Sequence, residues 1–514
     1  MGLSKSLYVT GSQCMKALWL KIHKPEEEEI TDALQSRFDT GQEIGELARQ
    51  LFAPFTLIEA RKPDGRPNID EMIHKTALVM DNSSVKTICE AAIAYDGNYC
   101  AVDILRRHGD GWDIYEVKSS SVDITSVKDV DKAKETYRPD YSYQRWVLEQ
   151  RNFKVNSVNL VLLNTNYVLD GELDIKELFS IIDVTDDCLE ADTVRAKVNE
   201  ADYVMNQDEE LIRDLTPHCK KPHDCLFMKY CLKQKGIEYP SVFNLYRAQW
   251  KKKLEYFNNG IVTFDDIMNN DVKLTSKTQK MQIDCTMNNK EYIDKTSIRG
   301  FLSGLKYPLY YLDFETMQPA VPIYQGTKPY QQIPFQYSLH IQYEPCGPLE
   351  HKEFLGDPNE DPRRALAEQL CRDIPRDACA VAYNKSFECG RIEEMANYFV
   401  DLREHLLDIR EHIVDLLEPF QSCYYYVPAM RDSFSIKSVL PALFPNSEEL
   451  NYHNLNENVQ NGAMAMTVYP AMRHMNEAEV AETRAALLAY CCLDTLAMVR
   501  VCEKLYEVSG PEKV

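Results

Sequence analysis

Two short stretches in the first half of the sequence place acidic and basic side chains where they could bind a metal ion. Asp103 stands alone among apolar residues in the strand-like run Tyr99–Arg106, and a second such run ends in Glu116-Val117-Lys118. Side chains alternate between the two faces of a strand, so Glu116 and Lys118 share a face. Two carboxylates offer the oxygen ligands that Mg²⁺ or Mn²⁺ prefers, and the amine could position an attacking water. Without further evidence, a Glu-x-Lys pattern more often reflects a cross-strand salt bridge than a metal site.

Three of the sixteen cysteines share a polar, proline-broken loop with the spacing C-x5-C-x5-C: Cys219, Cys225 and Cys231. Thiolates in such a loop are poor core residues and good ligands for soft metal ions. Cys14 could supply a fourth ligand if the N-terminal region meets this loop. Spacing alone does not separate an iron–sulfur cluster from zinc, for which His218 and His223 are also available.

A second acidic group lies in the other half of the chain. Asp313 and Glu315 alternate with Phe314 on an apolar strand, so both carboxylates face one side. Two carboxylates one pleat apart are costly unless a cation neutralises them, and the apolar neighbours disfavour a solvated strand end. Further along, Tyr490 and Asp494 are one turn apart on a predicted helix over 477–505 and share a face.

The elements that must position these residues alternate along the chain. In the first half, strands are predicted at 88–95, 99–106, 112–117 and 158–163, with a helix at 141–150, which is the order of an α/β core. We predict a first domain over 1–238, a helical linker over 239–300 and a second α/β domain over 301–514. The linker contains Asn259-Gly260 followed by a capping Thr263, and such a helical hairpin could grip a phosphate backbone, although a plain connector is the simpler interpretation.

Composition restricts the class of protein. Hydrophobic content of 44% and charged content of 27% are those of a globular protein. We find neither an apolar run of the roughly 18 residues that span a bilayer nor a signal peptide, so we expect no membrane association. Sixteen cysteines without an export signal indicate a reducing compartment, and we expect a cytoplasmic location. The net charge of −22 opposes general nucleic-acid binding but leaves room for a local basic groove.

The first half resembles the RecB-like branch of the PD-(D/E)XK nuclease superfamily. The matching residues are Glu90-Ala91-Ala92-Ile93, Val102-Asp103-Ile104-Leu105, Tyr115-Glu116-Val117-Lys118 and the helical stretch containing Gln144. The resemblance implies a restriction-endonuclease-like core in which Asp103 and Glu116 hold the metal ion, Lys118 and Gln144 are catalytic, and Glu90 is a possible third acid. The sequence departs from the family at Gly45, which stands where many members have a metal-binding histidine, and Glu46 could substitute for it.

The cysteines carry a further resemblance. One upstream cysteine followed by a three-cysteine cluster after the nuclease core resembles the iron–sulfur nucleases of the same branch, including the CRISPR-adaptation exonuclease and AddB-type families. This implies that Cys14, Cys219, Cys225 and Cys231 bind a [4Fe–4S] cluster, with zinc as the alternative. The cluster would join the N-terminal helix to the end of the domain, so its binding energy would be folding energy.

The second half resembles the DnaQ-like (DEDD) exonucleases, which implies an RNase H-like α/β domain. The matching order is D-x-E, N-x-x-x-[DE] and Y-x-x-x-D. It implies that two divalent ions are held by four acids: Asp313, Glu315, Glu388 and Asp494. Tyr490 would orient the attacking water. Glu388 departs from the aspartate usual in the family, and Asp415 is an additional acid that could support the site or cap a helix.

The combined arrangement resembles a prokaryotic family of predicted nucleases. We therefore expect a metal-dependent nuclease, with exonuclease action, whose partner is single-stranded DNA or duplex ends, or else RNA, in DNA processing, repair or defence. The first alternative is a nucleic-acid-binding protein in which one or both nuclease folds are inactive. The second is a metal-stabilised scaffold whose acidic surface recruits basic proteins.

Overall fold

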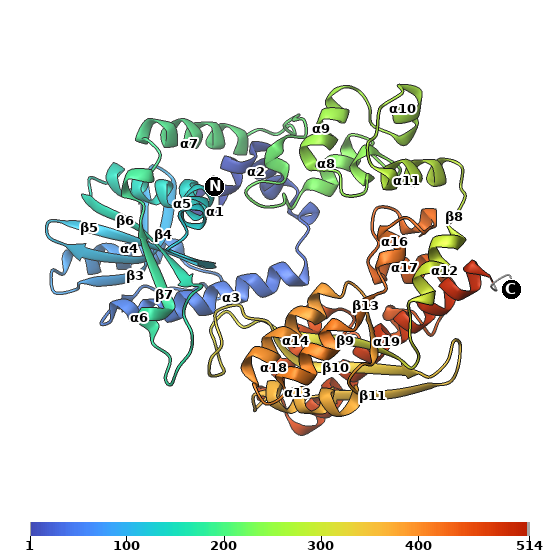
Figure 1. Cartoon of the computed structure of the whole chain (residues 1–514). Coiled ribbons are helices and arrows are strands. Elements are labelled where there is room, and N and C mark those ends of the chain that lie inside the picture. Colours follow the sequence, from blue (N-terminus) through green and yellow to red (C-terminus); the bar gives the residue numbers. More distant parts are fainter. Residues whose placement is uncertain (1, 511–514) are drawn as a thin grey trace. The chain divides into compact units, whose positions relative to one another are not determined.

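The predicted apolar strands assemble into two separate sheets in the computed structural model, which describes residues 2–510 (Figure 1). The chain divides into two units. Unit 1 comprises residues 1–236 together with the segment 319–331, and unit 2 comprises residues 237–318 and 332–514. Both units mix helices with strands, so the predicted α/β class is confirmed.

Unit 1 is built on a seven-stranded sheet in which β1 pairs with β4 beside the path β2-β3-β4-β5-β6-β7. Neighbours among β3, β4 and β5 are antiparallel, whereas β5 and β6 run parallel. All four predicted strands are confirmed, with longer ends, because their β-branched and aromatic residues suit a buried pleated surface. The strands are β1 (Leu3–Ser4), β2 (Thr56–Leu57), β3 (Thr87–Tyr95), β4 (Asn98–His108), β5 (Gly111–Val122), β6 (Val155–Asn164) and β7 (Phe179–Asp183).

The helix that follows β5 is longer than predicted. It begins at Val127, where the Ser126 side chain accepts a hydrogen bond from the Asp129 backbone amide as an N-cap, and it continues through Pro139. Its first half is charged and lacks an apolar stripe, so periodicity detects only the second half. The helices of unit 1 are α1 (Lys5–Gln13), α2 (Met15–His23), α3 (Asp32–Ala48), α4 (Ile69–Asp81), α5 (Val127–Gln150), α6 (Ile175–Leu178), α7 (Ala191–Met205) and α8 (Met228–Gln234).

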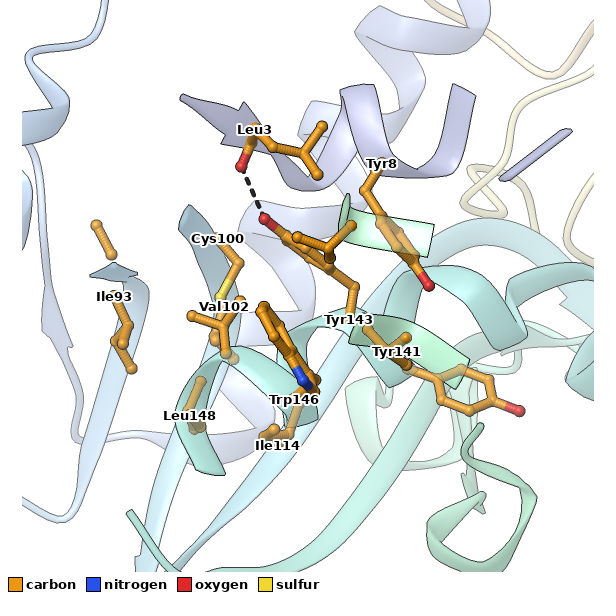
Figure 2. Close-up of a cluster of buried hydrophobic side chains, with 14 of the residues drawn as sticks. Leu3, Tyr8, Ile93, Cys100, Val102, Ile114, Tyr141, Tyr143, Trp146 and Leu148 are labelled. Carbon is orange, nitrogen blue, oxygen red and sulfur yellow. Dashed lines mark hydrogen bonds between the residues drawn. The ribbon is translucent and has the colours of Figure 1, made fainter. Parts of the chain in front are cut away.

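Aromatic packing fastens the N-terminal elements of unit 1 to α5 (Figure 2). The rings of Tyr8 and Tyr143 stack with centroids 4.5 Å apart, and the Tyr143 hydroxyl donates to the Leu3 carbonyl at 2.7 Å. Both rings are buried. Truncating a buried aromatic side chain costs about 3–5 kcal/mol. This packing fixes the position of Lys5, which lies between Leu3 and Tyr8 in the sequence.

Unit 2 contains a five-stranded sheet with the order β11-β10-β9-β12-β13. β9 pairs antiparallel with β10 and parallel with β12, and β10 pairs antiparallel with β11. Only β10 therefore runs against the rest of this sheet, because β12 and β13 are also parallel. The strands are β9 (Leu309–Met317), β10 (Ile333–Gln342), β11 (Leu349–Leu355), β12 (Cys379–Ala382) and β13 (Ile413–Asp415), with a separate pair β8 (Tyr292–Ile293) and β14 (Tyr425–Tyr426).

Residues 239–300 pack in unit 2, where Cys285 and Ile298 join the core that contains the C-terminal helix. The predicted helix break is confirmed at Gly260 (φ +75°), as is the cap in which Thr263 and Asp266 exchange hydrogen bonds. The helices of unit 2 are α9 (Trp250–Asn258), α10 (Phe264–Asn269), α11 (Lys277–Met287), α12 (Lys295–Ser303), α13 (Pro362–Asp373), α14 (Ser386–Tyr398), α15 (Arg403–Glu411), α16 (Glu418–Gln421), α17 (Ile436–Leu443), α18 (Gly462–Ala471) and α19 (Glu477–Ser509).

The segment 319–331, between β9 and β10 in the sequence, belongs to unit 1. The Leu169 amide donates to the Thr327 carbonyl at 3.0 Å, and the Tyr330 hydroxyl donates to the Ser119 carbonyl, one residue beyond Lys118. The domain boundaries predicted at 238 and 300 do not include this segment. A loop that packs in a different unit from its own strands leaves no local pattern in the sequence.

Helix α19 is long and apolar enough to cross a membrane by length and composition. However, 67% of its most apolar window is buried inside the protein. It packs against β9 and β10, and Leu487, Cys491 and Val499 are fully buried. The helix therefore serves as a core element of unit 2.

Candidate functional site

The predicted acidic pair of unit 1 comes together on adjacent strands. Ile104 on β4 lies opposite Tyr115 on β5, and this register brings Asp103 beside Glu116. The Asp103 carboxylate accepts a hydrogen bond from the Val117 amide at 2.8 Å, and Glu116 is completely buried. The predicted juxtaposition of Asp103 and Glu116 is thus present in the structure.

Glu116 is the centre of a network of charged hydrogen bonds. It accepts from Lys118 Nζ at 2.6 Å and from Gln144 Nε2 at 2.6 Å. Lys5 Nζ donates to both of its oxygen atoms, at 3.0 and 3.1 Å. The structure therefore gathers four of the predicted site residues, Asp103, Glu116, Lys118 and Gln144, in one place.

Two residues of this network escaped sequence reasoning. Lys5 reaches the site because β1 pairs with β4, and no local sequence motif predicts this pairing. Asp140 accepts hydrogen bonds from Lys118 and from Gln144 Nε2, the latter at 3.1 Å, and lies 3.6 Å from Lys5 Nζ. It precedes Gln144 by one helical turn, so the i, i+4 rule could have found it.

The two lysines of this network, Lys5 and Lys118, are held in the charged form. Burial alone lowers the pKa of Lys118, but the carboxylates of Asp140 and Glu116 outweigh it and raise the pKa above its ordinary value. The pKa of Lys5 is raised well above its ordinary value in the same way, by Asp103, Asp140 and Glu116 against the opposing effect of burial. Two ammonium groups therefore face three carboxylates.

Two other acids suggested by the resemblance make contacts outside this network. Glu90, with φ +57°, is unpaired in the ladder between β3 and β4, whose register is the same on either side of it, and forms an ion pair with Arg49 at 2.8 Å. Asp140, rather than Glu90, is the third acid of the network around Glu116. Glu46 is exposed on α3 and accepts a hydrogen bond from Gln42.

The four predicted cysteine ligands gather at the junction of α1 and α2. Cys14 links these two helices, and the adjacent Gln13 side chain donates to the carbonyls of His218 and His223, both at 2.8 Å. Burial raises the pKa of Cys225 to about 12, with contributions from the other three cysteines of the group: Cys14, Cys231 and Cys219. The N-terminal region therefore meets the C-x5-C-x5-C loop, which is the condition for Cys14 to supply a fourth ligand.

In unit 2, Asp313 and Glu315 on β9 meet Asp494 on α19. One carboxylate oxygen from each lies within 4.8 Å of the others. Glu388, in the first turn of α14, is buried, and its Oε2 atom has no hydrogen-bond partner among the described residues. The structure thus brings together the predicted acids of the second half, with Glu388 beside the group of three. A cation would satisfy the unpaired oxygen.

Burial and mutual repulsion disfavour ionisation of these acids. Burial, with the charges of Asp494, Glu388 and Glu315, raises the pKa of Asp313 well above its ordinary value. Burial also raises the pKa of Glu315 to about 8 and that of Asp494 to about 6. Within residues 2–510, no ion pair joins any of the four acids to a lysine or arginine.

Residues outside the predicted set complete the second cluster. The Lys437 ammonium on α17 donates to the Tyr490 hydroxyl at 3.0 Å, and the Tyr452 hydroxyl donates to Asp494. Neither Lys437 nor Tyr452 belongs to a motif that the sequence offers. Asp415 accepts from the amides of Asn384 and Leu417, so it caps backbone groups as one interpretation of the sequence allowed.

Comparison with known proteins matches one part of the chain. A family model described as a domain of unknown function (DUF2779) matches residues 310–435. This stretch contains Asp313, Glu315 and Glu388, whereas Tyr490 and Asp494 lie beyond it. No curated protein and no solved structure matches the chain.

Proposed function

We propose that the protein is a metal-dependent nuclease that hydrolyses phosphodiester bonds in DNA, with RNA as the alternative substrate. The observation that carries this proposal is the cluster of half-buried Asp313 with buried Glu315 and Asp494, with Glu388 beside it. Acids that burial and repulsion destabilise in the ionised form gain most from a bound cation. Oxygen-only ligands suit Mg²⁺ or Mn²⁺.

The two units are proposed to carry different nuclease folds. The order of the five-stranded sheet in unit 2, with only β10 reversed, supports a DnaQ-like exonuclease of RNase H-like fold. The antiparallel β3-β4-β5 strands followed by the parallel β6 support a RecB-like PD-(D/E)XK core in unit 1.

In unit 2, four acids would hold the ions: Asp313, Glu315, Glu388 and Asp494. Bound divalent ions stabilise the charge that develops on the phosphoryl group and make water a better nucleophile. Tyr490 accepts a hydrogen bond from Lys437 and lies within hydrogen-bonding reach of Asp494, so its hydroxyl stands at the acids where it would orient a water or a phosphate oxygen. The Lys437 ammonium at this edge offsets phosphate charge.

In unit 1, Asp103 and Glu116 would hold an ion, while Lys118 and Gln144 would position the water and the phosphate. The orphaned, buried Oε1 atom of Gln144 is free to accept a hydrogen bond there. Lys5 would have to leave Glu116 for an ion to bind, and the displaced ammonium could then contact the substrate phosphate.

We also propose that Cys14, Cys219, Cys225 and Cys231 hold a [4Fe–4S] cluster. The meeting of Cys14 with the C-x5-C-x5-C loop supports a shared metal centre, and the resemblance to iron–sulfur nucleases favours iron–sulfur over zinc. Anaerobically purified protein should be brown and absorb near roughly 400 nm, and Cys225→Ser should remove that absorption. Colourless protein with stoichiometric zinc would contradict the assignment. Such a cluster suits a cytoplasmic protein without membrane association.

One observation favours the alternative function, a nucleic-acid-binding protein in which unit 1 is inactive. Lys5, Lys118 and Gln144 already satisfy both oxygen atoms of Glu116. A carboxylate neutralised in this way binds a metal ion less readily. Unit 1 would then grip DNA while unit 2 performs hydrolysis.

The test is a cleavage assay on end-labelled single- and double-stranded DNA and RNA with Mg²⁺ or Mn²⁺. We expect cleavage by the wild type and by the control Glu457→Gln, which changes an exposed acid. Loss on Asp313→Ala but not on Lys118→Ala would make unit 1 a binding module. Wild-type protein without cleavage of any of these substrates would contradict the proposal.

A further inference from the structure

Two histidines and a cysteine meet in unit 2, away from the residues assigned to hydrolysis. His340 on β10 and His351 on β11 are register partners, and their ring centroids are 4.5 Å apart. Cys492 on α19 faces them. One potential ligand atom from each of the three residues lies within 4.8 Å of the others.

The hydrogen bonds of the two imidazoles are compatible with one neutral tautomer for each ring. When the Thr495 hydroxyl donates to the Cys492 carbonyl at 3.1 Å, it accepts from His340 Nδ1 at 2.8 Å and from the Ser338 hydroxyl at 2.7 Å. Ser338, having donated its hydrogen, must accept from His351 Nε2 at 2.9 Å. This assignment leaves lone pairs on His340 Nε2 and His351 Nδ1.

Hydrogen bonds of this kind, from one imidazole nitrogen to a nearby oxygen, are typical of histidines that bind a metal ion. A ligand imidazole normally donates its second N–H to a neighbouring oxygen, which fixes its tautomer and its orientation. Here Ser338 and Thr495 provide those oxygens. Because both rings are neutral in this assignment, they repel neither each other nor an incoming cation.

The site is accessible on one side and supported on the other. His340 is 6% exposed, Cys492 is half-buried and His351 is exposed, so an ion can enter from solvent beside β11. Glu353, two residues after His351, shares its face of the strand and can complete the coordination, as can water.

We propose that His340, His351 and Cys492 bind a structural Zn²⁺ ion that fastens the edge strand β11 to α19. Two imidazole nitrogens and one thiolate are typical zinc ligands and poor ligands for Mg²⁺. On binding, the Cys492 thiol releases its proton to solvent and its sulfur forms the bond to zinc. This site is separate from the acid cluster and does not depend on the proposed nuclease activity.

The test measures zinc bound per full-length chain after equilibration in buffered Zn²⁺ and gel filtration. We expect His351→Ala and Cys492→Ser each to lose one zinc equivalent relative to the wild type. The matched controls His453→Ala and Cys346→Ser, which change exposed residues outside the site, should retain it. Zinc content unchanged in both site variants would overturn the proposal.

A Co²⁺ titration provides a second readout that does not depend on folding defects. Cobalt bound to a thiolate gives a charge-transfer band in the near ultraviolet. The absorbance of this band should be larger in the wild type than in Cys492→Ser, by the amount expected for one bound Co²⁺ ion. The circular dichroism spectra of the two proteins should coincide. Equal bands from wild type and Cys492→Ser would overturn the assignment of Cys492 as a ligand.

Discussion

Two acid clusters of this protein use the same side chains but differ in what balances their charge. In unit 1, two of the three carboxylates form close ion pairs with Lys118, and Lys5 lies within 4 Å of all three. In unit 2, three of the four carboxyl groups are buried and Asp313 is half-buried, and the nearby Lys437 donates to Tyr490 rather than to an acid. Arg391, near Glu388, is itself paired with Glu394.

This difference shows that an acidic sequence motif does not by itself determine whether nearby lysines neutralise its carboxylates in the folded protein. The cluster in unit 1 is nearly neutral without a metal ion, so it can fold and persist alone. The cluster in unit 2 must be protonated or neutralised by a cation, because desolvation and repulsion both oppose its ionised form. We therefore expect divalent ions to bind more tightly in unit 2.

The largest expected effect is on hydrolysis. Asp313→Asn keeps the side-chain shape but removes one ligand charge, and metal-dependent cleavage should fall by at least about 10²-fold. Glu457→Gln, an exposed acid outside both clusters, should cleave at the wild-type rate. Retained activity in Asp313→Asn would show that the acids of unit 2 do not support catalysis.

The two clusters should respond to neutral substitutions with opposite changes in metal-free stability. Glu116→Gln leaves Lys5 and Lys118 with less countercharge in a buried site and should cost about 3 kcal/mol of unfolding free energy. Asp313→Asn relieves repulsion and should raise the unfolding temperature. Urea and thermal unfolding in a chelator measure both. The same sign of change in the two variants would remove the distinction between the clusters.

Lys5 offers a way to make the first cluster resemble the second. Lys5→Met removes an ammonium group that competes with a cation for Glu116, so Mn²⁺ affinity in unit 1 should rise about tenfold. Calorimetric titration of Lys5→Met in the Asp313→Asn background isolates that site. Unchanged affinity would mean that Lys5 does not limit metal binding.

The smallest expected effect concerns Glu210, which accepts hydrogen bonds from Lys24 and Tyr230 and pairs with Lys16 at 2.8 Å. Burial opposes them, but these partners lower the pKa of Glu210 to about 2. Ionised Glu210 therefore adds about 1–2 kcal/mol to the free energy of unfolding, after allowance for solvent screening. This contribution is present above about pH 4.5 and is lost as pH falls towards 2. Wild type and Glu210→Gln should therefore differ in stability at pH 7 and converge in acid.

A stability difference between these two proteins that stays constant from pH 7 to pH 3 would contradict the role of Glu210. Exposed Glu457→Gln, which loses no such partners, should show no pH-dependent difference from the wild type.

The sequence predicts features that depend on local periodicity. Alternation placed Glu116 and Lys118 on one face, and helical spacing placed Tyr490 one turn from Asp494. The α/β class of both halves follows from the same patterns. Asp140 could have been predicted as well, because it precedes Gln144 by four residues.

Features set by tertiary contact could not be predicted. Lys5 enters the first site through the pairing of β1 with β4, and Glu90, with φ +57°, pairs instead with Arg49. Lys437 lies on an apolar helix whose pattern indicates only packing. The segment 319–331 follows a strand of unit 2 yet packs in unit 1.

The central claim is that the acids of unit 2 form a divalent-metal site. Anomalous diffraction from a crystal of the full-length protein soaked in Mn²⁺ tests it most directly. We predict a manganese peak in contact with carboxylate oxygens of Asp313, Glu315 and Asp494. An ordered site with no peak at saturating Mn²⁺ would contradict the account.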